Sequence, residues 1–141
     1  MKIREKIREE RGSELLEAAL VLPIFVLVML AAVNLGMVVY AGQMANEAAR
    51  HGVRMGSVAQ SDQVGIAVSA AQDFADTAFA VGHPRVDVLA PGGVLGSKLK
   101  LRVTYTVPNF LAGLGSLFPG IPSGQFVVSG EATMRQEGWL R

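Results

Sequence analysis

Cysteine is absent from this chain of 141 residues, and histidine occurs only twice, as His51 and His83. The missing cysteines exclude disulfides, thiolate metal sites and cysteine nucleophiles, but they do not fix the compartment. The two histidines fall in different predicted elements, without the spacing of metal ligands. No serine lies in a nucleophile-elbow motif, and the glycines at 92, 93 and 96 lack the lysine of a phosphate-binding loop. We therefore expect no enzyme activity and no cofactor.

Charge is also scarce. Charged residues make up 18% of the chain and hydrophobic residues 50%, whereas globular domains carry about 25% charge. The deficit is concentrated in one place, because Glu17 and Glu47 bracket 29 consecutive residues without a formal charge. As a helix, residues 18–40 would span about 34 Å, against a hydrocarbon core about 30 Å thick. The sequence therefore predicts a transmembrane helix.

The charges beside this apolar run predict its orientation. Five Lys and Arg residues precede the run, while only Arg50 and Arg54 follow it closely. The positive-inside bias then predicts a single-pass inner membrane protein with a cytoplasmic N-terminus and a periplasmic or extracellular C-terminal domain. Two alternatives stay open. The run could be a secretory signal cut after Ala41, although such signals have cores of about 7–15 residues. It could also be a buried core helix, which little else in the chain could cover.

The junction between the basic head and the apolar run carries a more specific pattern. It reads RGSELLEA over residues 11–18, so that Glu17 stands five positions after Gly12. This pattern resembles the processing site of type IV prepilins. Residues 11–52 are similar to the N-terminal signature of TadE-like pseudopilins of the tight-adherence (Flp) pilus system, including Pro23 and the small residues before Arg50.

The resemblance implies a minor pseudopilin that serves as a structural subunit in pilus assembly. A prepilin peptidase would cut after Gly12, leaving Ser13 as the first residue and Glu17 as the fifth-position glutamate. Glu14 adds a second carboxylate without the expected spacing. The implied partners are the membrane, the peptidase, the major pilin, other pseudopilins and the pilus assembly platform, with no small-molecule substrate. From the residues alone, Glu17 is either held for a specific partner or is an interfacial side chain that reaches toward water.

Helical patterning continues beyond the apolar run to about Arg54. We expect a leader over residues 1–12, a transmembrane and spine helix over 13–56, and a small exported domain over 57–141. Pro23 is expected to kink the helix. Small residues recur four apart, which lets helices approach closely but also occurs in ordinary alanine-rich helices. The candidate helix-packing residues are Ala32, Gly36, Ala41, Ala45 and Ala49.

The exported domain is predicted to be α+β, with one helix and an antiparallel sheet of about three strands. The helix is expected to start at Ser61 and Asp62 and to continue until Gly82 and Pro84 end it. Strands are expected over residues 85–90, 98–107 and 125–135, with a turn over 91–93. In the second strand, residues 99, 101, 103, 105 and 107 point one way. The opposite face carries Lys98, Lys100 and Arg102, and it lacks the aromatics of a nucleic-acid surface, so we expect no nucleic-acid partner.

Residues 108–124 form a loop that is rich in glycine and proline yet strongly apolar. Its large side chains could form a lid over the sheet, or Phe110, Leu114 and Phe118 could form a surface for a subunit partner. Two other functions also stay open beside the pseudopilin. One is an envelope scaffold that remains anchored and uncleaved, and the other is a binding domain released after Ala41.

Overall fold

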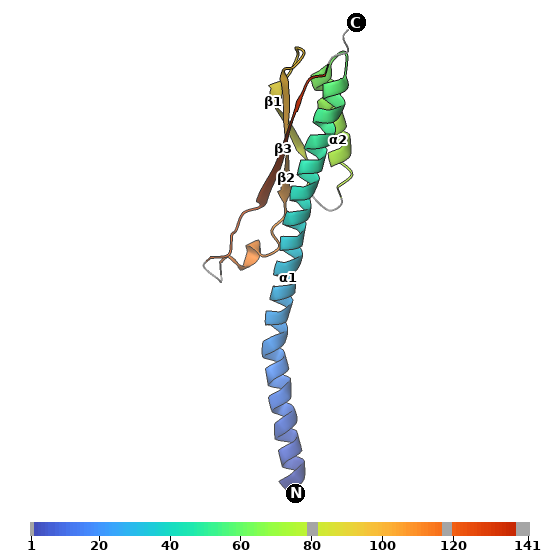
Figure 1. Ribbon diagram of the computed structural model, residues 1–141. Helices are drawn as coiled ribbons and strands as arrows, with labels where there is room; N and C mark the ends of the chain where they lie inside the picture. The colour runs from blue at the N-terminus through green and yellow to red at the C-terminus, as the bar shows by residue number, and fades with distance from the viewer. Residues whose placement is uncertain (1, 79–81, 117–119, 138–141) are drawn as a thin grey trace. The chain divides into compact units, whose positions relative to one another are not determined.

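The computed structural model describes residues 2–78, 82–116 and 120–137, with side chains from Glu14 onward. It confirms the predicted α+β architecture (Figure 1). Helix α1 (Lys2–Val58) is followed by helix α2 (Gln63–Ala75) and by strands β1 (Arg85–Pro91), β2 (Lys98–Val107) and β3 (Phe126–Arg135). A short 3-10 turn, η1 (Ala112–Leu114), lies between β2 and β3. The chain divides into two compact units, which meet between Val33 and Asn34.

Helix α1 differs from the expected spine helix at both ends. It begins at Lys2, within the predicted leader, and runs to Val58. The leader is rich in Arg, Lys and Glu, which are good helix formers, and its first glycine is Gly12. Pro23 lies inside the helix without ending it.

Helix α2 begins where the sequence predicts and ends earlier. The Asp62 side chain accepts a hydrogen bond from the Gly65 amide at 3.2 Å and caps the first turn. The helix ends at Ala75 because the next residues turn back on it, and the Thr77 hydroxyl donates to the Phe74 carbonyl at 2.6 Å. Gly82 therefore plays no part in ending the helix.

The three strands form one antiparallel sheet in the order β1-β2-β3. The five inward side chains of the central strand are fully buried, as predicted, and they are Leu99, Leu101, Val103, Tyr105 and Val107. Pro91 is the last residue of β1 rather than the first of a turn, and it pairs with Leu99. Because β1 is an edge strand, a residue without an amide hydrogen is tolerated there.

Helix α2 and the part of α1 after Asn34 cover one face of this sheet (Figure 1). The helices contribute mostly alanine to the core, whereas β2 contributes the large side chains. A Cβ at Gly52 of α1 would lie 2.6 Å from the Ala67 carbonyl oxygen of α2, and a Cβ at Gly130 of β3 would lie 2.3 Å from the Asn46 amide nitrogen. The core therefore depends on small residues that bring backbones close together.

Candidate functional site: the apolar helix and the loop beside it

The unit before Asn34 consists of helix α1 alone; apart from Glu14 and Glu17, its described side chains are apolar, and all but Leu27 are exposed. Within Glu14–Val58, the most apolar window of 18 residues has a mean hydropathy of 2.6, and none of that window is buried. Leu15 and Phe25, for example, are 72% and 62% exposed. Such a surface is costly in water, and this part of α1 lacks the burial expected of the core helix of a soluble domain. One N-terminal apolar helix of this kind suggests single-pass membrane anchoring.

The candidate processing residues lie on this helix. The backbone of Gly12 and Ser13 belongs to α1, and their side chains fall outside those the structure describes. Glu14 and Glu17 are both exposed. Because Ser13 and Glu17 are four residues apart in one helix, they share a helical face.

The candidate helix-packing residues divide into two groups. Ala41, Ala45 and Ala49 are fully buried within this chain, in the core that α1 makes with α2 and the sheet. At these three positions the small residues pack within the chain's own core. Ala32 and Gly36 are exposed, and no atom outside the helix would lie within 4 Å of a Cβ at Gly36.

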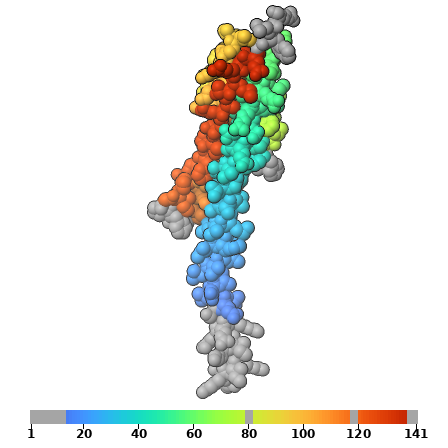
Figure 2. All heavy atoms as spheres, viewed as in Figure 1, coloured from blue at the N-terminus to red at the C-terminus, as the bar shows by residue number. Residues whose placement is uncertain are grey.

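Asn34 lies within the charge-free run and is a functional candidate that the sequence analysis did not single out. It is 3% exposed. Its amide nitrogen donates to the Pro108 carbonyl at 3.2 Å, and its side-chain oxygen accepts from the Phe110 amide at 2.9 Å. Both halves of the carboxamide therefore hold the start of the apolar loop, and a space-filling view shows this loop lying against α1 (Figure 2). A lone polar residue in an apolar helix was the available signal.

The apolar loop is held closed by a second asparagine. The Asn109 amide nitrogen donates to the carbonyls of Pro122 and Gly124 at 2.5 and 3.1 Å, and its side-chain oxygen accepts from the Leu111 amide at 3.0 Å. Of the three candidate partner-surface residues, Phe110 is 49% exposed, Leu114 is half-buried, and Phe118 lies outside the described residues.

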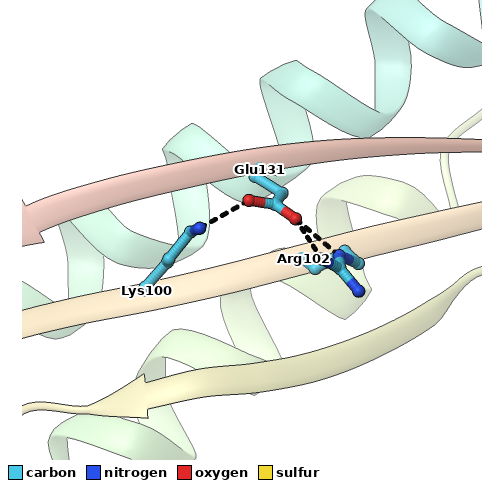
Figure 3. Close-up of polar contacts among 3 residues, drawn as sticks. All are labelled: Lys100, Arg102 and Glu131. Carbon is cyan, nitrogen blue, oxygen red and sulfur yellow. Dashed lines mark hydrogen bonds and ion pairs between the residues drawn. The ribbon is translucent and has the colours of Figure 1, made fainter.

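The basic face of β2 is neutralised in part by a glutamate of β3 (Figure 3). The Glu131 carboxylate contacts Lys100 Nζ at 2.6 Å and accepts a hydrogen bond from Arg102 Nε at 2.7 Å. The hydrogen bonds from these two cations lower the pKa of Glu131. Sequence reasoning missed Glu131 because the pairing of Arg102 with Glu131 depends on strand register. The pairing leaves less free positive charge for an anionic partner.

An open groove of about 620 Å³ lies beside α1 and β3. Its titratable lining residues are Glu47, Arg50, His51, Arg54 and Glu131. The His51 ring stacks on Phe74, with centroids 5.3 Å apart. Among the residues with described side chains, no cluster of three or more His, Asp or Glu could hold a metal ion.

Comparison with known proteins matches the first part of the chain to a protein family. Residues 12–54 match the family of TadE-like proteins, and this confirms the resemblance drawn from the sequence for that segment. The match begins at Gly12 and ends within α1, so α2 and the sheet lie outside it. No curated protein and no solved structure matches the chain.

Proposed function

We propose that this protein is a minor pseudopilin, a structural subunit in the assembly of a tight-adherence pilus, which a prepilin peptidase processes after Gly12. The observation that carries the proposal is the family match, which starts at the glycine of the candidate processing site. The resemblance to TadE-like proteins suggests the involvement in pilus assembly. Cleavage after Gly12 and the role of minor subunit are the parts of the proposal that go beyond this suggestion.

The exposure of the first unit supports this proposal. Most of the described side chains of α1 before Asn34 are apolar and exposed, and lipid or the helices of other subunits would have to cover them in the cell. The protein would sit in the inner membrane with its N-terminus in the cytoplasm and its sheet outside. Its partners would be the peptidase, the major pilin, other pseudopilins and the assembly platform.

The intact mass of the protein extracted from membranes tests the proposal against its two rivals. We expect a mature chain that begins at Ser13. A chain that begins at Met1 would indicate an uncleaved envelope scaffold, and one that begins at Gly42 would indicate a domain released by signal peptidase.

Substitution at the cleavage glycine sharpens the test. Gly12→Val should leave the protein in the membrane at full precursor length, because a bulky side chain at this position would obstruct the close approach of the backbone to the peptidase active site. Glu14→Gln changes a neighbouring residue without changing this approach, and it should mature as the wild type does. Normal maturation of Gly12→Val would contradict the assignment of the cleavage site.

A further inference from the structure

The unit after Asn34 has an end without charges. In the sequence, no formal charge occurs between Arg102 and Glu131, nor between Glu17 and Glu47. The fold places parts of these two stretches side by side, because Asn34 of α1 binds the backbone of the loop that follows β2. We propose that this end, which includes the loop residues Phe110, Leu111, Leu114 and Ile121, is embedded in the headgroup layer of the bilayer that α1 enters. The proposal rests on the membrane anchoring in the proposed function.

In the register of β2 with β3, the charged residues of these two strands lie at the opposite end of the sheet from the apolar loop. Lys98 pairs with Arg135, and Arg102 pairs with Glu131. From the pair of Val103 and Gly130 onward to the last pair of β2 with β3, every residue is uncharged. The loop between these strands therefore extends from the uncharged end of the sheet, and Val127 on that end is 70% exposed. Exposed apolar side chains without charges fit a lipid interface better than bulk water.

Asn34 fixes the depth of the loop. A transmembrane helix needs about 20 apolar residues to cross the hydrocarbon core. A transmembrane segment that begins after Glu17 therefore ends near Met37. Asn34 lies three residues before that point, about 4.5 Å along a helix axis. A polar side chain at this depth is unfavourable unless it is paired, and here both of its polar atoms bind the loop backbone. The loop therefore lies at the boundary between hydrocarbon and headgroups.

The backbone of the loop suits this layer and not the hydrocarbon core. Irregular backbone exposed to lipid tails would leave polar groups unpaired, whereas headgroups and their water can pair with them. Asn109 already satisfies the carbonyls of Pro122 and Gly124 and the amide of Leu111. Phe110 is then free to insert its ring among lipids, since aromatic side chains favour this interface.

Lipid quenching of single tryptophans tests the proposal in the full chain. The chain has one tryptophan, Trp139, which Trp139→Phe removes. In that background, Phe110→Trp reports on the loop, Phe25→Trp on the span, and Val94→Trp on the exposed turn between β1 and β2. Each protein is reconstituted in vesicles of phosphatidylethanolamine and phosphatidylglycerol, without brominated lipids, with lipids brominated near the headgroup, or, for Phe25→Trp, with lipids brominated deep in the acyl chain.

We expect bromination to lower the fluorescence of Phe110→Trp by about twofold, as for a side chain within about 5–10 Å of the headgroups, and to leave Val94→Trp unchanged. Addition of Asn34→Leu should reduce the quenching of Phe110→Trp. Asn46→Leu is the matched control, because the Asn46 side chain donates to the Gly42 carbonyl of its own helix and not to the described part of the loop; this change should leave the quenching as it was.

The three reporters separate this inference from the proposed function. If brominated lipids quench Phe25→Trp but not Phe110→Trp, α1 is anchored and the loop proposal is wrong. If they quench neither, the membrane anchor fails and the inference fails with it. Quenching of Phe110→Trp that falls as protein density rises would also overturn the proposal, in favour of a second copy of the chain on the loop. Constant quenching across protein densities would support lipid as the partner.

Discussion

At the scale of single residues, Gly130 shows how a missing side chain can decide the packing of a domain. It lies in β3 opposite Val103, where the strand crosses beneath α1. A Cβ at this position would lie 2.3 Å from the amide nitrogen of Asn46 and 2.5 Å from the carbonyl carbon of Ala45. Both atoms are helix backbone, which cannot move aside as a flexible side chain can. The close approach of α1 to the sheet therefore requires glycine here.

We expect Gly130→Ala to lower the free energy of unfolding by about 1–3 kcal/mol, the usual cost of forcing extra volume into a packed core. Chemical denaturation of the full chain in detergent, followed by near-UV circular dichroism, would measure the change. Gly124→Ala is the matched control, because no atom would lie within 4 Å of its Cβ, and we expect a change below about 0.5 kcal/mol. Equal effects of the two substitutions would contradict the close-approach argument.

Tyr105 is the largest fully buried side chain of β2, and it links the sheet to the end of α2. Its hydroxyl donates to the Ala75 carbonyl at 2.7 Å. Burial raises the pKa of Tyr105 from 10.0 to about 12. Because the folded pKa lies above the unfolded one, the stabilisation is complete below pH 10 and is lost as the pH rises toward 12.

This shift predicts an alkaline unfolding transition that Tyr105→Phe weakens. Between pH 10 and 12, the wild type should lose about 1.4 kcal/mol per pH unit relative to the variant. At pH 7, the variant should be less stable by about 0.5–1.5 kcal/mol, since one hydrogen bond is gone, while the Ala75 carbonyl still accepts from the Ala78 amide. Denaturation midpoints of both proteins from pH 7 to 12 would measure the difference. Parallel pH profiles would refute the role assigned to Tyr105.

At the scale of elements, the strands were the part most predictable from the sequence. The central strand matches its predicted bounds at residues 98–107, and its five alternating apolar residues are buried. A strict alternation of apolar and polar residues is typical of a strand with one buried face. The end of α2 was less predictable, because apolar spacing continues to Ala78 while the helix ends at Ala75. Hydrogen bonds from Thr77 and Tyr105 stabilise that earlier end, and the second of these comes from another element.

The spacing of small residues in α1 shows why the candidate site was only partly predictable. Ala41, Ala45 and Ala49 have the spacing of a packing face, and they do lie on one. The spacing does not reveal what this face packs against. In the structure it packs against the chain's own α2 and sheet and not against the helix of another subunit. The bonds of Asn34 to the loop were equally hidden, since the two segments are 74 residues apart in the chain. Spacing along the sequence predicts which residues share a helix or strand face. It does not predict which distant segment packs against that face.

At the scale of the whole molecule, the parts of α1 before and after Asn34 differ in their surroundings. After Asn34, one face of the helix packs into the core of its own domain, although side chains such as Leu35 and Val39 stay exposed, whereas the described side chains before Asn34 are almost all exposed. The candidate for a specific contact there is Glu17. Cleavage after Gly12 would give Ser13 a free amine, whose unperturbed pKa of about 7.7–8.0 makes it mostly cationic at neutral pH.

We predict that Glu17→Gln is inserted and cleaved normally but fails to enter the assembled pilus. Glu17 can neutralise the Ser13 amine of its own helix, four residues away, or that of a subunit displaced along the pilus axis. The second arrangement removes two charges from lipid at once and fixes the axial register. Loss of one member of such a desolvated pair costs about 3–5 kcal/mol, whereas a surface pair contributes under about 1 kcal/mol. The size of the assembly defect therefore distinguishes the two arrangements.

Glu14→Gln is the matched control for this prediction, because it removes the same charge from the same exposed stretch of α1 without the five-residue spacing from Gly12. Crosslinking between subunits and counts of surface pili would be compared for both variants and the wild type. Glu14→Gln should assemble almost normally, since at the helix end its carboxylate can reach water at little cost. Wild-type assembly by Glu17→Gln would reduce Glu17 to an interfacial side chain. The apolar surface of α1 would then have to set the register between subunits by packing alone.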